Sequence, residues 1–172
     1  MSGGEWVLLA YRMPREPSTP RIAVWRKLER LGVARLGDGL VALPADARTR
    51  EQLEWLADEI SDGGGTAMVW LGRPASQAQE RDLAAAMAAA RAAEYVALTD
   101  AAHTALGADP TGHRSAVRKL RAELRRITRR DHFPPADRER AEAALADLAS
   151  AAEAEAEAEP EHVVAPPVRG QS

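Results

Sequence analysis

Strand-like and helix-like segments alternate in one order at the start of the chain, and this order limits the fold more than any other feature of the sequence. Residues 5–13 contain an apolar run with the composition of a buried strand. Thr19 and Pro20 then provide an N-cap and a proline at the first helical position, and Gly32 ends the helical pattern. The chain therefore begins with a strand followed by a helix.

Two short strand segments, residues 33–36 and 40–44, follow this helix. The turn Gly37-Asp38-Gly39 joins them, and an Asp-Gly pair adopts the positive φ angles that tight hairpins require. Thr49 and Gln52 form a capping-box pattern at the start of a second helix. We therefore expect a hairpin and then a helix with one apolar face.

The glycine run Gly63-Gly64-Gly65 separates the second helix from a last strand at residues 66–71. A phosphate-binding glycine loop precedes a helix, whereas this run precedes a strand, so we interpret it as a helix stop. The complete order is β-α-β-β-α-β, which is the split β-α-β or ferredoxin-like arrangement. We expect residues 1–74 to form an α+β domain in which two helices back a four-stranded antiparallel sheet.

The second part of the chain is alanine-rich and helical throughout. A capping box of Ser76 and Gln79 starts a long helix that ends near Leu106. Two more helices are expected at residues 113–130 and 136–152.

The last two helices have narrow apolar faces that suit packing against each other. The first of them repeats apolar residues at alternating spacings of three and four, at Val117, Leu120, Leu124 and Ile127. Pro134-Pro135 separates the two helices, so we expect an antiparallel helical hairpin within a helical domain of residues 75–152. Residues 153–172 have too few large apolar side chains to offset chain entropy, and we expect a disordered acidic, proline-rich tail there.

Composition argues against several classes of function. The absence of cysteine excludes disulfides, thiolate metal ligands and a cysteine nucleophile. No signal peptide and no apolar run of about 18 residues is present, so we expect a cytoplasmic protein with no membrane partner. No serine has a G-x-S-x-G setting, and the four histidines lack ligand spacing: His103, His113, His132 and His162. We therefore expect no enzyme activity, no metal and no cofactor.

The helix at residues 113–130 concentrates positive charge, although the formal net charge of the chain is only -3. Such a stripe can neutralise DNA phosphates and release counterions. The residues predicted to contact DNA are Arg114, Arg118, Lys119, Arg121, Arg125, Arg126, Arg129 and Arg130. The alternative is a solvated face that pairs with acids of the next helix, namely Asp137, Glu139, Glu142 and Asp147.

Two tryptophans and four arginines of the first domain are further candidates for a functional role. Trp25 and Trp55 lie on the two helices of the first domain, where we expect them to pack against the sheet or each other. Four arginines near the first β-α turn are candidates for an oxyanion site: Arg12, Arg15, Arg21 and Arg26.

The order and spacing of several segments over residues 5–149 resemble the N-terminal region of the ChrB family of chromate-resistance regulators. These segments are Trp6 in the opening strand, Val24-Trp25-Arg26-Lys27-Leu28, Val41-Ala42-Leu43-Pro44, Glu54-Trp55-Leu56, Gly64-Gly65, residues 89–95, Arg130-Asp131-His132-Phe133-Pro134 and Ala141-Glu142-Ala143-Ala144-Leu145. The hairpin region is also similar to the ferredoxin-like domain of PaaX-type repressors.

The resemblance implies a regulator of transcription associated with chromate or another oxyanion. ChrB-family proteins are usually about twice as long and carry a C-terminal chromate-resistance domain, so we expect a stand-alone N-terminal module here. Our first hypothesis is a homodimeric regulator whose basic helix contacts DNA, with an oxyanion as a further ligand. The second is an adaptor that binds a partner helix through Leu120, Leu124 and Ile127 without nucleic acid. Exposure of the arginine stripe distinguishes the two.

Overall fold

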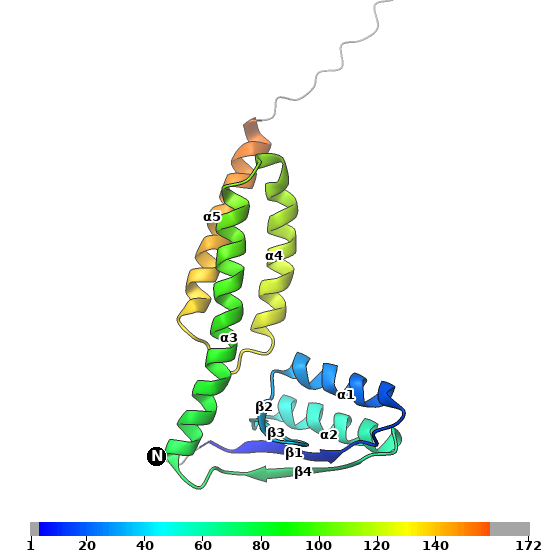
Figure 1. The fold of residues 1–172 in the computed structure, drawn as a ribbon. Coiled ribbons are helices and arrows are strands. Elements are labelled where there is room, and N and C mark those ends of the chain that lie inside the picture. Colours follow the sequence, from blue (N-terminus) through cyan, green and yellow to red (C-terminus); the bar gives the residue numbers. More distant parts are fainter. Residues whose placement is uncertain (1–3, 159–172) are drawn as a thin grey trace, which may run out of the picture.

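The structure, a computed structural model, describes residues 4–158 and comprises a four-stranded sheet with two helices followed by a bundle of three helices (Figure 1). The elements are β1 (Trp6–Arg12), α1 (Ser18–Leu31), β2 (Ala34–Gly37), β3 (Leu40–Pro44), α2 (Ala47–Asp62), β4 (Thr66–Gly72), α3 (Gln77–Leu106), the 3-10 turn η1 (Pro110–Gly112), α4 (His113–Thr128) and α5 (Asp137–Ala158).

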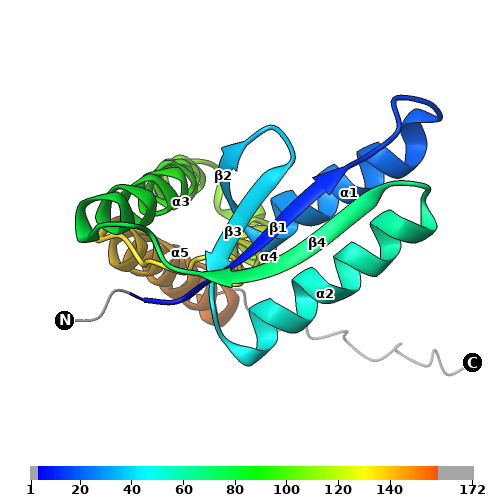
Figure 2. The ribbon, with the colours of Figure 1, turned by 90° about the horizontal axis from the view of Figure 1, so that it is seen from below.

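The sheet has the strand order β2-β3-β1-β4, and each neighbouring pair is antiparallel. β1 is central, with Leu9 opposite Val41 of β3 on one side and Val69 of β4 on the other. Helices α1 and α2 run along one face of this sheet (Figure 2). This topology confirms the predicted ferredoxin-like α+β arrangement.

The first hydrophobic core lies between the sheet and its two helices. β1 alternates its side chains between faces, and Val7 and Leu9 are directed to the helices. They pack in one buried cluster with Leu28 of α1 and with Leu53 and Ile60 of α2. The apolar face predicted for the second helix is therefore the face that meets the sheet.

Trp25 and Trp55 do not pack as predicted. Trp25 is 52% exposed and Trp55 is 65% exposed. Each tryptophan is adjacent in sequence to a residue that faces the core: Val24 precedes Trp25, and Leu56 follows Trp55. Because consecutive helical residues are about 100° apart, the indoles lie outside the buried stripe.

The second core lies within the bundle of α3, α4 and α5. Tyr95 and Leu98 of α3, Ile127 of α4 and Leu148 of α5 are buried together there. α4 and α5 pack against each other as predicted, and α3 joins them as a third helix (Figure 1). α3 has 30 residues, about 45 Å at 1.5 Å per residue, and its Met87 belongs to the first core. One continuous helix therefore belongs to both halves of the molecule.

Several helix ends differ from their predicted positions. α1 starts at Ser18 with Pro17 at the N-cap and no side-chain cap bond, so Thr19 is not its cap. α2 starts at Ala47 because Asp46 takes the N-cap position and pairs with Thr49. α5 continues to Ala158, six residues beyond the predicted end, and residues 159–172 of the predicted tail lie outside the described residues.

None of the helices formed by residues 4–158 is long and apolar enough to cross a lipid bilayer.

Candidate nucleic-acid interface

α4 is amphipathic, and its apolar side is directed into the bundle. Val117, Leu120 and Ile127 are buried, and Leu124 packs against them. The arginines at 114, 118, 121, 125 and 129 follow spacings of three and four residues, which align them along the other side of the helix. From Arg114 to Arg129 this row is about 22 Å long.

The basic side of α4 is open to solvent. All eight residues predicted to contact DNA are exposed except Arg130, which is half-buried. Arg126 pairs with Glu123 of the same helix, and Arg130 pairs with Glu94 of α3. In the described part of the chain the other six cations have no carboxylate within ion-pair distance: Arg114, Arg118, Lys119, Arg121, Arg125 and Arg129.

The acids of α5 do not neutralise this row. Glu142 pairs with Arg138 at 2.9 Å, and Asp137 pairs with Arg140 at 2.8 Å, so both acids are engaged within their own helix. No ion pair among residues 4–158 joins an α4 arginine to α5. The stripe is therefore solvated, but the pairing with Asp137, Glu139, Glu142 and Asp147 that the alternative required is absent among residues 4–158.

A groove of about 370 Å³ runs between α4 and α5 beside the basic row. Four α4 arginines line it: Arg114, Arg118, Arg121 and Arg125. Its α5 wall contains Ala149, Ala152 and Ala156, whose small side chains leave the space open, and Glu153 is its one acid. The groove therefore has an apolar base and a strongly basic edge.

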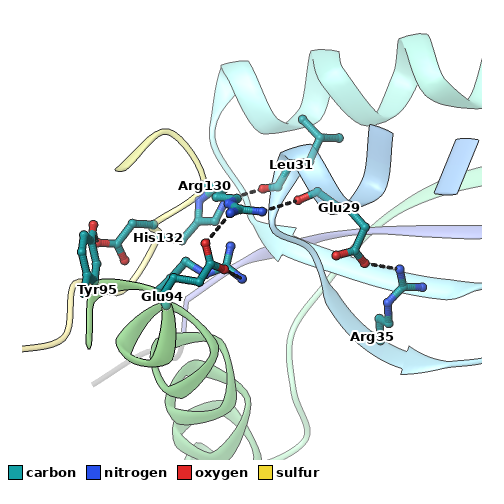
Figure 3. Close-up of polar contacts among 9 residues, drawn as sticks. Glu29, Leu31, Arg35, Glu94, Tyr95, Arg130 and His132 are labelled. Carbon is teal, nitrogen blue, oxygen red and sulfur yellow. Dashed lines mark hydrogen bonds and ion pairs between the residues drawn. The ribbon is translucent and has the colours of Figure 1, made fainter. Parts of the chain in front are cut away.

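The segment between α4 and α5 docks the bundle onto the sheet domain (Figure 3). His132 donates a hydrogen bond from Nε2 to the carbonyl oxygen of Leu31 at the end of α1, at 3.0 Å. The ring of Phe133 stacks on Trp6 of β1 with 5.9 Å between ring centroids. Arg130 lies between Glu94 and the backbone of α1, with Nη1 3.5 Å from the carbonyl oxygen of Glu29 (Figure 3). His132 thus belongs to the turn between two helices, as predicted.

Tyr95 and Asp131 fix the bundle side of this joint. The Tyr95 hydroxyl donates to Asp131 Oδ2 at 2.8 Å. Burial raises the pKa of the Tyr95 phenol above its ordinary value, so the hydroxyl remains a donor at neutral pH. The position of the segment that follows α4 is therefore set from both α1 and α3.

A second basic cleft, of about 520 Å³, lies at this joint, and we call it the joint cleft. Its lining includes Arg125, Arg126, Arg129 and Arg130 of the predicted set. It also includes Arg30 from the end of α1 and Arg48 from the start of α2. Sequence reasoning missed Arg30 and Arg48 because they are isolated basic residues in the other half of the molecule, with no local pattern that indicates their partners.

The arginines considered for an oxyanion site only partly converge. Arg12, Arg15 and Arg21 line a cleft of about 960 Å³ between the β1–α1 loop, α1 and the β2–β3 turn. Tyr11 and the exposed Trp25 line the same cleft. Arg26 is not among its lining residues, because it lies next to Trp25 on a different side of α1.

The histidines do not come together. Among residues 4–158 no three residues of the types His, Cys, Asp and Glu form a group that could hold a metal ion. His113 is buried at the start of α4, His132 is engaged with Leu31, and His162 lies outside the described residues.

Comparison with known proteins points to one family. The family model described as "Protein ChrB, N-terminal" matches residues 21–105. A relative, Protein ChrB of Cupriavidus metallidurans, is 28% identical over 164 residues, which are 93% of this chain and 50% of the relative. The chain thus spans about half the length of that relative. No solved structure matches the chain.

Proposed function

The chain is related to the N-terminal half of ChrB-family proteins, and from this premise we propose that it is a regulatory protein that binds DNA through the exposed basic side of α4. At the level of the family, the relationship supports a regulator associated with chromate resistance. The observation that carries the proposal is the row of α4 arginines with no acidic partner from α5. The proposed partner is duplex DNA, bound mainly through its phosphates.

The chemistry of the row suits a phosphate backbone. Arginine keeps its charge at all physiological pH values and presents a planar fork that can donate two hydrogen bonds to one phosphate. Phosphate contacts of this kind release condensed counterions, so binding weakens as salt rises. Arginines spaced along about 22 Å of one helix can contact several phosphates at once. We therefore expect strongly salt-dependent binding with little sequence preference from α4 alone.

The apolar surface that the adaptor hypothesis requires is not accessible to a partner. Leu120 and Ile127 are buried between α4 and the other two helices, and Leu124 packs against the same cluster. A partner helix could reach this seam only if the bundle opened. We therefore propose the nucleic-acid function ahead of the adaptor.

The test is a titration of the full chain with the DNA upstream of its own gene and with an unrelated duplex, at several salt concentrations. The variant Arg114→Gln/Arg118→Gln/Arg121→Gln should bind both duplexes more weakly and lower the salt slope by about 2 to 3, if each arginine contacts one phosphate. The fold should be unaffected, because these side chains lie off the buried seam.

A matched control removes the same charge elsewhere. Arg35, Arg81 and Arg140 are exposed residues of β2, α3 and α5, and they line neither the groove between α4 and α5 nor the joint cleft. Their triple Gln variant should bind DNA with nearly the parent's salt slope. Equal slopes for the α4 variant and the parent, or a parent that shows no salt-dependent binding, would refute the proposal.

A further inference from the structure

Arginines from three separate helices meet in the joint cleft. Arg30 comes from the last turn of α1, Arg48 from the first turn of α2, and Arg125 and Arg129 from the end of α4. The cleft is therefore built by both halves of the molecule, whereas the groove between α4 and α5 belongs to the bundle alone.

The acids around the joint cleft are already engaged with other cations. Glu94 pairs with both Arg91 and Arg130, and Glu123 pairs with Arg126. Glu29, next to Arg30 in sequence, pairs with Arg35 at 2.6 Å.

The four remaining arginines therefore have no carboxylate within ion-pair distance in the described part of the chain. They are Arg30, Arg48, Arg125 and Arg129. Like charges held in one cleft repel one another, and the repulsion opposes folding unless an anion enters.

The joint fixes the backbone positions from which these arginines extend. Gly32 has a φ of 67°, and a Cβ at this position would lie 2.6 Å from the carbonyl oxygen of Arg130. Only a glycine therefore allows the end of α1 to approach the end of α4 so closely. Together with the hydrogen bond from His132 to Leu31, this contact holds the end of α1, which carries Arg30, against the segment that follows α4. Because the helix ends that carry the arginines are already in place, only the arginine side chains have to be ordered when an anion binds.

We infer that the joint cleft binds an anion with two or more phosphate groups, held by arginines of both halves. Its volume of about 520 Å³ lies within the range typical of small-molecule sites. Multidentate phosphate recognition by planar guanidinium groups matches this lining. The phosphates can belong to a nucleic-acid backbone, in which case the inference deepens the proposed DNA binding, or to a free phosphorylated small molecule.

The experiment uses inorganic pyrophosphate as the probe, with the full chain, at constant ionic strength. Saturable binding is measured by calorimetric titration and by the rise of the unfolding temperature. The variant Arg30→Gln/Arg48→Gln should weaken pyrophosphate binding at least about tenfold, since both residues donate charge-assisted hydrogen bonds. The matched control Arg81→Gln/Arg140→Gln, at exposed positions of α3 and α5 that do not line the joint cleft, should bind pyrophosphate as the parent does.

The unfolding temperature without pyrophosphate shows whether the variant Arg30→Gln/Arg48→Gln is folded. Arg30 and Arg48 are exposed, so their replacement should leave the unfolding temperature without pyrophosphate equal to that of the parent or higher, because repulsion is relieved. The inference is wrong if the parent shows no saturable pyrophosphate binding, or if the joint variant and the control variant bind it equally.

Duplex DNA distinguishes the two sources of phosphate. If the cleft serves a nucleic-acid backbone, the joint variant should also bind DNA more weakly, and pyrophosphate should displace DNA from the parent. If it serves a small molecule, the joint variant should bind DNA as the parent does. If the parent binds pyrophosphate but no DNA, anion binding in the joint cleft is supported and the proposed DNA binding is refuted. The experiment therefore distinguishes a failure of the inference from a failure of the proposed function.

Discussion

At the scale of single residues, Ile60 tests which face of α2 meets the sheet. Its side chain is 0% exposed within the first core. Ile60→Asp places an unpaired charge there and should lower the free energy of unfolding by several kcal/mol, on the order of 3 to 5. Trp55→Asp on the same helix is the control, since Trp55 is exposed and should change stability by less than about 1 kcal/mol. Urea denaturation measures both, and equal effects would contradict the assignment of the face.

Asp46 shows a residue-scale effect that depends on pH. Its carboxylate accepts the backbone N–H of Thr49 at 2.7 Å, and this bond holds the pKa of Asp46 below its ordinary value. Because the pKa is lower in the folded state, the stabilisation is present above about pH 4 and is lost as pH falls through the folded pKa.

Asp46→Ala should therefore cost about 1 kcal/mol at pH 7 and much less at pH 3. Denaturation curves at the two pH values measure this difference. Asp58→Ala, at an exposed position in the middle of α2, is the control and should show little change at either pH. A cost for Asp46→Ala that stayed constant with pH would argue against a charged cap.

At the scale of elements, the contact between α1 and the end of α4 depends on Gly32. Gly32→Ala combines a left-handed backbone with a Cβ that overlaps Arg130, so it should cost at least about 1 to 2 kcal/mol. Gly37→Ala is the control, because a Cβ added at Gly37 would have no neighbour within 4 Å. This substitution should change stability by less than about 0.5 kcal/mol. Thermal unfolding of the two variants compares them directly, and equal unfolding temperatures would show that the close approach is unimportant.

At the scale of the whole molecule, the two cores are connected by α3 and by the joint. Met87 of α3 belongs to the first core, whereas Tyr95, two turns later, belongs to the second. All four tryptophans lie before residue 71, so their fluorescence reports on the sheet domain, while far-UV circular dichroism at 222 nm reports mostly on the bundle. We expect coincident unfolding curves from the two probes, as one cooperative transition requires.

Phe133→Ala removes the stacking on Trp6 that contributes to the joint. It should lower the free energy of unfolding by about 3 kcal/mol or less, because the ring is only partly buried, and should separate the two unfolding curves. Val96→Ala, at an exposed position of α3, serves as the control and should keep the curves coincident. Curves that separate already in the parent would show that the two halves are not coupled.

Local patterns were sufficient to predict the order of strands and helices and the topology of the sheet. Apolar periodicity, Gly32 and the Gly63-Gly64-Gly65 run are properties of neighbouring residues, and they act through the backbone of their own segment. The basic row of α4 was also visible, because residues three and four apart in one helix share a side. The starts of α1 and α2 and the end of α5 were not predicted correctly, since several residues compete for a cap and tertiary packing extends a helix.

Only the tertiary structure decided whether the basic row is free and what lies beside it. Ion-pair partners depend on distances between helices, and here Glu142 and Asp137 pair within α5. The joint cleft places Arg30 and Arg48 beside Arg125 and Arg129, which are far away in sequence. No local pattern relates these positions, because the packing of the bundle against the sheet domain brings them together. The sequence by itself therefore determined the elements and where positive charge is concentrated, and the packing of one half on the other determined which charges meet in one cleft.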